Sequence, residues 1–483
     1  MIIKSILILH RYLGVVLGVL MTVWCLSGFV MMYQGFPEAS RAERMAGLET
    51  LDSSSCCGGG IVLPDAATIS SMRIEMLAGA PVMRLQGGGA PRTVDLNTRE
   101  DVTGLDETKI RSVISAFAAG NEIEGDIKRL EQIRVDQWTA QTARRQAPVW
   151  RAKLSDPASS WVYASGQTGE VFQHATLSER WLSWFGAVPH WLYPTILREN
   201  QPLWYQSVIW LALAGTFLTV TGLVVGISKL RGRSGRWFPY RRPMWMWHHA
   251  FGFFAGVLVL TWVFSGLLTM SPWGLFQSPP TIDRSAVVPP TSWGDVRPIL
   301  QEIADDPNAQ EIVQIRTSTL FGETSLIAEM RDGQSRRYSP DGLQGDYNPE
   351  DISRLVANAP EPLRSGVAEL LETEDAYYYG HKQPADLPVL RVQLADEQKS
   401  RIYIDPASGD VHRFVGATQK RYRWLESGFH SFDFPVLKER PIWDIAVLLL
   451  LAVTTVVCAT GAWLSITRVR RDITRIWPKR RRS

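Results

Sequence analysis

Histidines are the residues of this 483-residue chain whose positions point most directly to chemistry. Four of the eight histidines occupy matching places in two similar stretches: His10 and His248 each begin an apolar segment, and His190 and His430 each close the stretch that follows. Imidazole is a common axial ligand of haem iron, and a polar ring at the edge of a lipid-spanning helix needs a partner. The pattern therefore predicts that these histidines bind haem iron.

The two stretches align without a gap over residues 9–32 and 247–270. Within this alignment, His10 matches His248, Gly14 matches Gly252, Gly18 matches Gly256 and Ser27 matches Ser265. Beyond it, Arg151 matches Arg391, Tyr163 matches Tyr403, His190 matches His430 and, after one deletion, Gly222 matches Gly461. Self-similarity of this length indicates an internal duplication in which each half is one structural unit.

Glycines follow the first histidine of each half at a helical spacing. Gly14 and Gly18 come four and eight residues after His10, and Gly252 and Gly256 follow His248 in the same way. These positions share one helix face, and the missing side chains leave room for a flat macrocycle. Small residues also permit close helix packing in membranes, but packing does not explain a histidine in both copies.

His249 competes with His248 as the ligand in the second half. The residues four and eight positions after His249 are Phe253 and Val257, so the glycine face belongs to His248. We therefore prefer His248. For His249 a contact with a haem propionate and a place at the membrane interface both remain open.

Four long runs without charged residues indicate a membrane protein. They cover residues 12–33, 203–228, 245–277 and 445–467, and each exceeds the roughly 20 residues that cross a hydrocarbon core. Basic residues crowd the loop between the second and third runs and the C-terminal tail, which places both on the cytoplasmic side. Position beside apolar runs favours this interpretation over nucleic-acid binding.

The polar segments between the runs predict two small α+β domains outside the cytoplasm. Residues 104–120 and 348–359 have helical spacing, whereas residues 149–173 and 389–415 predict strands joined by glycine turns. The predicted fold is a bundle of four transmembrane helices with two such domains. The expected divisions are a first helix (1–33), a first outer domain (34–180), an elbow and second helix (181–228), a basic loop (229–243), a third helix (244–277), a second outer domain (278–420), an elbow and fourth helix (421–467) and a basic tail (468–483).

Prolines after His190 and His430 indicate where these two histidines lie relative to the membrane. Pro194 and Pro202 follow His190, and Pro435 and Pro441 follow His430, so the helix cannot be continuous there. We expect each histidine on an interfacial elbow at the outer side. His10 would then pair with His248 near the inner face, and His190 with His430 near the outer face. Other pairings remain open at this point.

Several motifs resemble one protein family. They are LHRYLGVVLGVL at residues 9–20, SGFVMM at 27–32, IYIDPASGDV at 402–411 and FHSFDFP at 429–435. The chain resembles the PepSY-associated transmembrane proteins, which include bacterial siderophore-interacting ferric reductases and iron-regulated inner-membrane proteins. The resemblance implies four spans, PepSY-like outer domains, b-type haem and electron delivery to iron outside the cytoplasm. One departure is PHWLYPTILRENQP at residues 189–202, where the second half has FHSFDFPVLKERP.

These observations lead to a functional expectation. We expect an inner-membrane protein with two haem b groups, which passes electrons to a ferric siderophore or another periplasmic iron chelate. Because no dinucleotide-binding motif occurs on the cytoplasmic side, the donor is expected to be a separate reductase or a quinol. The alternative is a non-redox PepSY protein that binds, inhibits or chaperones an exported protein.

Two further features leave alternatives open. Cys56-Cys57 lies in a glycine-rich segment and indicates either a soft-metal site or a flexible loop, whereas Cys25 and Cys458 lie in apolar runs as small side chains. Tyr377–Tyr379 and His381 form an aromatic cluster that either contacts a chelate or edges a sheet.

Overall fold

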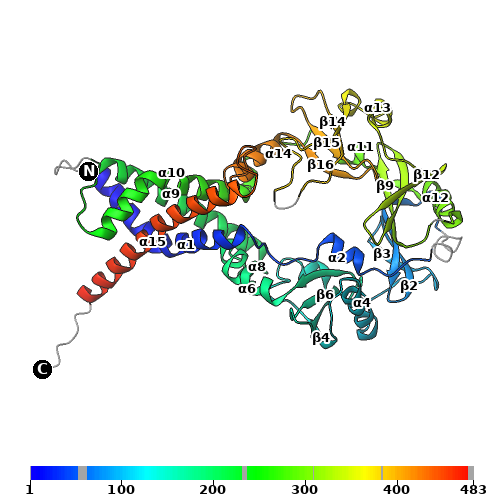
Figure 1. Ribbon diagram of the computed structural model, residues 1–483, viewed down its shortest axis with the longest axis horizontal. Coiled ribbons are helices and arrows are strands. Elements are labelled where there is room, and N and C mark those ends of the chain that lie inside the picture. The colour runs from blue at the N-terminus through cyan, green and yellow to red at the C-terminus, as the bar shows by residue number, and fades with distance from the viewer. Residues whose placement is uncertain (1, 53–62, 231–236, 308, 382–383, 477–483) are drawn as a thin grey trace. The chain divides into compact units, whose positions relative to one another are not determined.

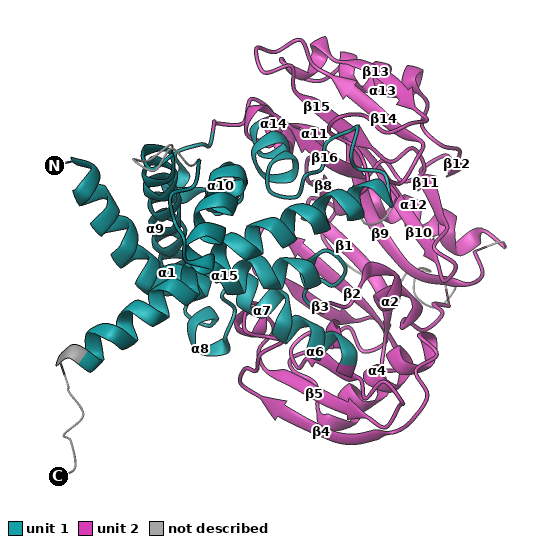
Figure 2. Cartoon of the chain, turned by 60° about the vertical axis from the view of Figure 1, so that its left-hand side comes forward, with its two compact units in different colours: residues 1–36, 178–277, 421–483 teal, residues 37–177, 278–420 magenta. Residues whose placement is uncertain are grey.

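The computed structural model describes residues 2–52, 63–230, 237–307, 309–381 and 384–476. The chain divides into two compact units (Figure 2). Residues 1–36, 178–277 and 421–483 make up the helical unit, and residues 37–177 and 278–420 make up the sheet unit.

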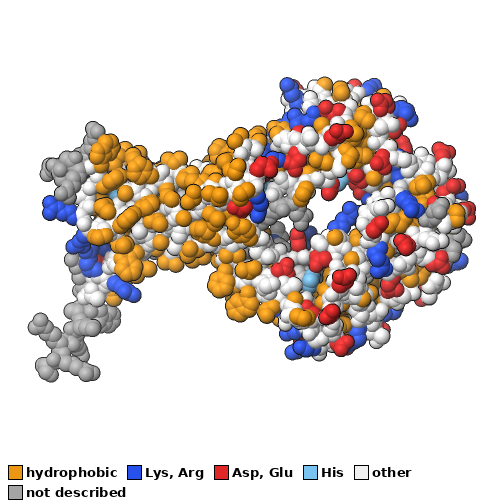
Figure 3. All heavy atoms as spheres, viewed as in Figure 1, with side chains coloured by type: hydrophobic (Ala, Val, Ile, Leu, Met, Phe, Trp, Pro, Cys, Tyr) orange, Lys and Arg blue, Asp and Glu red, His pale blue; other side chains and the backbone are white. Residues whose placement is uncertain are grey.

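Four long helices dominate the helical unit (Figure 1). They are α1 (Ile2–Met31), α9 (Gln201–Ser228), α10 (Pro243–Thr269) and α15 (Ile442–Ile476). Each is long and apolar enough to cross a membrane, so the four predicted transmembrane helices are confirmed among the described residues. Hydrophobic side chains cover the visible face of these helices (Figure 3), as expected for surfaces that face lipid.

Two helix ends differ from the sequence expectation. The third helix ends at Thr269, not at residue 277, because Ser271 takes a left-handed conformation (φ 45°) and Pro272 cannot continue the helix. The fourth helix continues past residue 467 to Ile476. There, Arg468 pairs with Asp472 one turn later at 2.7 Å, and this pair helps to extend the helix beyond the apolar run.

Short helices connect the polar segments to the second and fourth spans. Before α9 these are α6 (Leu177–Phe185), α7 (Ala187–His190) and α8 (Thr195–Arg198); before α15 these are α14 (Ala417–Tyr422) and a π-helical turn, η3 (Arg423–Gly428). Pro194 immediately precedes α8, and Pro202 lies in the first turn of α9, where a missing N–H is tolerated. The two halves therefore differ locally around His190 and His430.

One eight-stranded antiparallel sheet contains strands from both halves of the chain. Its order is β12-β11-β10-β9-β1-β2-β3, with β8 paired to β1. The strands are β1 (Thr68–Leu77), β2 (Ala80–Gly87), β3 (Arg92–Asp95), β8 (Thr291–Ser292), β9 (Ile312–Leu320), β10 (Glu323–Met330), β11 (Ser335–Ser339) and β12 (Gly342–Gln344). The halves join where β1 pairs with β9, with Arg73 opposite Arg316. The sequence patterns did not predict this sheet.

Two four-stranded antiparallel sheets complete the sheet unit. One contains β4 (Ile127–Ile133), β5 (Val149–Leu154), β6 (Trp161–Ser165) and β7 (Val171–Ala175); the other contains β13 (Val367–Leu371), β14 (Val389–Gln393), β15 (Arg401–Ile404) and β16 (Val411–Val415). Helix α4 (Glu107–Gly120) packs on the first sheet, and α13 (Pro349–Ala357) packs on the second. These helices and most of these strands lie in the segments whose patterns predicted them.

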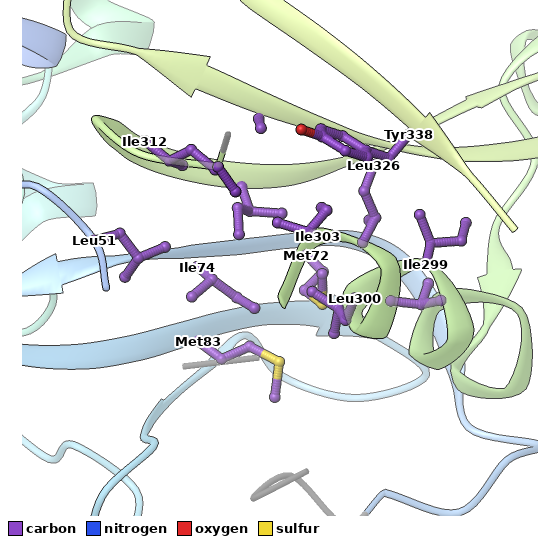
Figure 4. Packing of buried hydrophobic residues seen from close by; sticks show 14 of the residues in the cluster. Leu51, Met72, Ile74, Met83, Ile299, Leu300, Ile303, Ile312, Leu326 and Tyr338 are labelled. Carbon is purple, nitrogen blue, oxygen red and sulfur yellow. The ribbon is translucent and has the colours of Figure 1, made fainter. Parts of the chain in front are cut away.

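The core of the eight-stranded sheet lies under α12 (Trp293–Asp305). Ile299 and Ile303 of α12 pack against Ile74 of β1 and Leu326 of β10 (Figure 4). Each such side chain contributes about 1.5–3 kcal/mol when fully buried. The remaining short elements are α2 (Arg41–Ala46), α5 (Ala143–Gln146), α11 (Arg284–Val287), η1 (Pro272–Gly274) and η2 (Leu363–Ser365).

Candidate functional site

Four histidines meet in two pairs inside the helical unit. The first pair is His10 of α1 and His248 of α10, whose ring centroids lie 6.3 Å apart with the planes inclined at 26°. The second pair is His190 of α7 and His430, which follows η3; their centroids lie 6.1 Å apart at 59°. The structure thus brings together the same partners that the repeat and the expected depths suggested.

Backbone carbonyl groups orient both rings of the first pair. Nδ1 of His10 lies 3.0 Å from the carbonyl oxygen of Leu218 in α9, and Nδ1 of His248 lies 3.1 Å from that of Val457 in α15. A carbonyl oxygen can only accept a hydrogen bond, so Nδ1 carries the proton in each neutral ring. Nε2 is then the atom with a free lone pair.

Threonines reinforce this orientation in both halves. The hydroxyl oxygen of Thr221 lies 3.4 Å from His10 Nδ1, and that of Thr460 lies 3.2 Å from His248 Nδ1. Each histidine of the first pair therefore meets the same two kinds of group on a neighbouring helix, a carbonyl and a threonine.

Serine hydroxyl groups orient the rings of the second pair. Nδ1 of His190 lies 3.0 Å from the hydroxyl oxygen of Ser27, and Nδ1 of His430 lies 3.2 Å from that of Ser265. Each serine hydroxyl donates its own hydrogen to a carbonyl one turn earlier in its helix, so its oxygen accepts from the imidazole.

Both rings of the second pair are half-buried. Burial, together with the nearby His430, lowers the pKa of His190 to about 4, and burial also lowers the pKa of His430. Both rings are therefore neutral near pH 7, the form in which imidazole binds metal ions.

The spacing within each pair fits one metal ion between two rings. An imidazole nitrogen lies about 2 Å from the metal ion that it binds, so two rings on opposite sides of one ion have centroids about 6 Å apart. The two pairs have centroids 6.3 and 6.1 Å apart. Across the described residues, none of the four Nε2 atoms makes a hydrogen bond that would block this arrangement.

A metal ion held by protein side chains alone fits less well. Within the described ranges, no group of three or more His, Cys, Asp or Glu side chains is arranged to hold a metal ion. Each histidine pair supplies only two ligands. Two imidazoles would suit an iron whose other ligands come from a porphyrin, so the residues present fit haem.

A cavity of about 430 Å³ opens beside the first pair. Its volume lies in the usual range for a ligand pocket. Both histidines line the cavity, as do the four glycines that sequence analysis singled out: Gly14, Gly18, Gly252 and Gly256. Five basic residues also line it: Arg11, Lys229, Arg242, Arg468 and Arg471. Such side chains could pair with the carboxylates of a ligand.

The glycines also serve helix packing. A Cβ added to Gly18 would lie 3.2 Å from the Cα of Ala462 in α15, and one added to Gly256 would lie 2.6 Å from Leu223 in α9. Around Gly252, by contrast, the nearest atom would be 4.0 Å away. The cavity and the packing interpretations of these glycines therefore both apply, and neither excludes the other.

Two glycines that sequence analysis did not select lie closest to the first pair. A Cβ added to Gly222 would lie 2.8 Å from His10 Cε1, and one added to Gly461 would lie 3.0 Å from His248 Cε1. The sequence carried a signal for them, because the repeat aligns Gly222 with Gly461. The same register aligns Thr221 with Thr460.

The side chain of His249 makes different contacts from that of His248. Its Nε2 lies 2.8 Å from the carbonyl oxygen of Gly226, and its ring makes edge contacts with Phe238 and Tyr240. It lines the same cavity, but the ring that is paired with His10 is that of His248. This placement agrees with the preference for His248 as the ligand.

The two other clusters noted in the sequence are the adjacent cysteines and the tyrosine cluster. Cys56 and Cys57 lie outside the described residues. In the tyrosine cluster, Tyr378 is buried and stacks on Tyr403 with centroids 5.0 Å apart. This stacking favours a structural role, with Tyr378 packed against the inner strand β15.

Comparison with known proteins adds one match. Residues 7–354 match the family described as PepSY-associated TM region. The chain belongs to this family. Together with the four apolar helices, membership identifies a multi-pass membrane protein. A search among curated proteins found no match.

Proposed function

We propose that this PepSY-associated protein is an inner-membrane electron carrier with two haem b groups. The proposal rests on two pairs of neighbouring imidazoles, with centroids 6.3 and 6.1 Å apart, in which Nδ1 of every ring is anchored to the protein. Bound haem would supply one-electron redox chemistry, and two histidines bound to its iron would favour electron transfer over oxygen activation.

The chain's own residues have definable roles in this proposal. His10 and His248 would hold one haem, and His190 and His430 the other. The hydrogen bonds to Nδ1 fix ring orientation and increase the basicity of Nε2. Arg11 and Arg242, which line the cavity, would pair with the propionates of the first haem.

The proposed direction of transfer follows from the basic residues. Lys and Arg gather beside the ends of the long helices near the first pair, so that end is proposed to face the cytoplasm. The second pair and the sheet unit would then be on the periplasmic side. Electrons would enter from a cytoplasmic reductase or a quinol.

The proposed acceptor is a ferric siderophore or another iron chelate in the periplasm. Support for it comes from the resemblance to siderophore-interacting reductases, because no described side-chain cluster marks an iron-chelate site. An internal duplication would explain why equivalent residues occur at both histidine pairs.

Vesicles containing the full chain can test this function. A reductant enclosed in the vesicles and a ferric chelate outside should yield external ferrous iron, detected by an impermeant ferrous-specific dye. Ferrous iron should form faster than in empty vesicles, and His10→Ala or His430→Ala should abolish the difference. The exposed His412 provides the control, because His412→Ala should transfer like the unchanged protein.

The alternative predicts a different outcome. A non-redox protein that binds an exported partner would produce no ferrous iron above the empty-vesicle rate, and the histidine substitutions would have no effect on transfer.

A further inference from the structure

Two cysteine side chains touch within the membrane-spanning part of the helical unit. The sulfur atoms of Cys25 in α1 and Cys458 in α15 lie 3.6 Å apart. Cys458 is buried and Cys25 is half-buried. The two thiols come from opposite ends of the sequence, so their contact depends entirely on the packing of α1 against α15.

Helices α1 and α15 pack closely on both sides of Cys25. A Cβ added to Gly18 would lie 3.2 Å from the backbone Cα of Ala462, and one added to Gly28 would lie 3.0 Å from the side-chain methyl Cδ2 of Leu451. Cys25 lies between these two glycines on α1, seven residues after Gly18 and three before Gly28. This spacing places all three on one helix face. Cys25 therefore lies on the face of α1 that packs against α15.

A disulfide requires such an approach. Its sulfur atoms are about 2 Å apart, and its Cα atoms are usually about 4.4–6.8 Å apart. The observed sulfur separation of 3.6 Å leaves roughly 1.5 Å to close, a change within reach of small side-chain rotations.

The other helix pair shows that packing here does not require thiols. In the repeat alignment, Cys25 corresponds to Val263 in α10, and Cys458 corresponds to Thr219 in α9. Thr219 donates a hydrogen bond to the carbonyl of Gly215 at 2.9 Å, and Val263 lies against the same glycine. A valine and a threonine thus fill the equivalent space without any redox chemistry.

We propose that Cys25 and Cys458 form a reversible disulfide that joins α1 to α15. Each thiol loses its hydrogen, a sulfur–sulfur bond forms, and two electrons and two protons leave. A membrane-soluble quinone can take up both and become a quinol. The half-buried Cys25 gives such an oxidant access from the side of the bundle.

Oxidation of the full chain in lipid vesicles by a soluble quinone tests this proposal. The variant Cys56→Ser/Cys57→Ser is used as the background, so that only Cys25 and Cys458 remain. Both thiols should be lost to maleimide labelling, and the peptides of α1 and α15 should be recovered as one species, lighter by two hydrogen atoms. Dithiothreitol should reverse both changes.

Two controls keep the result interpretable. Cys25→Ser in the same background should leave one labelled thiol and yield no intramolecular cross-link. His10→Ala/His248→Ala should cross-link as well as the parent, because the disulfide does not depend on haem. Persistence of both thiols under the quinone, or cross-links only between separate chains, would overturn the proposal without bearing on the proposed electron transfer.

Discussion

At the residue scale, the four imidazoles are defined by what holds Nδ1. Carbonyl oxygens of Leu218 and Val457 hold the first pair, and serine hydroxyls hold the second. In each ring Nδ1 therefore carries the proton, and the lone pair of Nε2 is free to bind a metal ion. The histidines could be found from the repeat alone. Their carbonyl partners could not, because every residue has a carbonyl and nothing in the sequence marks the one that accepts.

Gly222 offers a test at this scale. Gly222→Ala places a Cβ 2.8 Å from His10 Cε1, too close for the ring to stay in place. We expect the haem at the first pair to be lost or loosened while the second haem remains, so that haem content falls by about half. Absorbance of the purified protein measures the change.

A neighbouring glycine on the same helix provides the matched control. A Cβ added to Gly226 would meet only His249, at 3.9 Å, so Gly226→Ala should retain full haem content. Equal losses in the two variants would contradict the assigned position of His10.

At the element scale, polar contacts fasten single elements onto the sheets. Helix α2 begins with a capping box in which Ser40 and Glu43 satisfy each other's backbone N–H groups. The Glu43 carboxylate also contacts His174 of β7 at 2.8 Å. Elsewhere, Asp375 accepts a hydrogen bond from Tyr403 and pairs with Arg391. These contacts give a structural role to Tyr403 and Arg391, two of the residues that the repeat alignment matched.

Glu43 predicts a pH dependence. Burial opposes its ionisation, but hydrogen bonds from His174 and Ser40 outweigh burial and lower its pKa from 4.5 to about 2. A lowered pKa in the folded state stabilises the protein above the unfolded value, and the contribution is lost as pH falls through the folded value. Glu43 should therefore stabilise the sheet unit above pH 4.5 and cease to do so as pH falls towards 2.

Thermal unfolding of the full chain in detergent can measure this effect. Between pH 4.5 and 2, Glu43→Gln should lose less stability than the unchanged protein, because its side chain does not titrate. Glu38→Gln, at an exposed position nearby, should behave like the unchanged protein. A pH profile of Glu43→Gln identical to that of the unchanged protein would show that the hydrogen bonds to the Glu43 carboxylate contribute nothing to stability.

At the scale of the whole molecule, the sequence predicted the membrane part better than the sheet unit. Uncharged runs and flanking arginines are local signals, and they located the four long helices within a few residues except at the ends near Thr269 and Ile476. The eight-stranded sheet depends on β1 pairing with β9, where Arg73 faces Arg316. A contact between residues so far apart leaves no local pattern, and this sheet was therefore missed.

Haem stoichiometry tests whether each histidine pair holds one haem. Pyridine haemochrome analysis of the purified full chain should give two b-type haems per chain, one after His10→Ala or His248→Ala, and one after His190→Ala or His430→Ala. His249→Ala, which leaves both pairs intact, should retain two. Protein that is folded but contains no haem, or a haem content unchanged by substitution within either pair, would contradict the account.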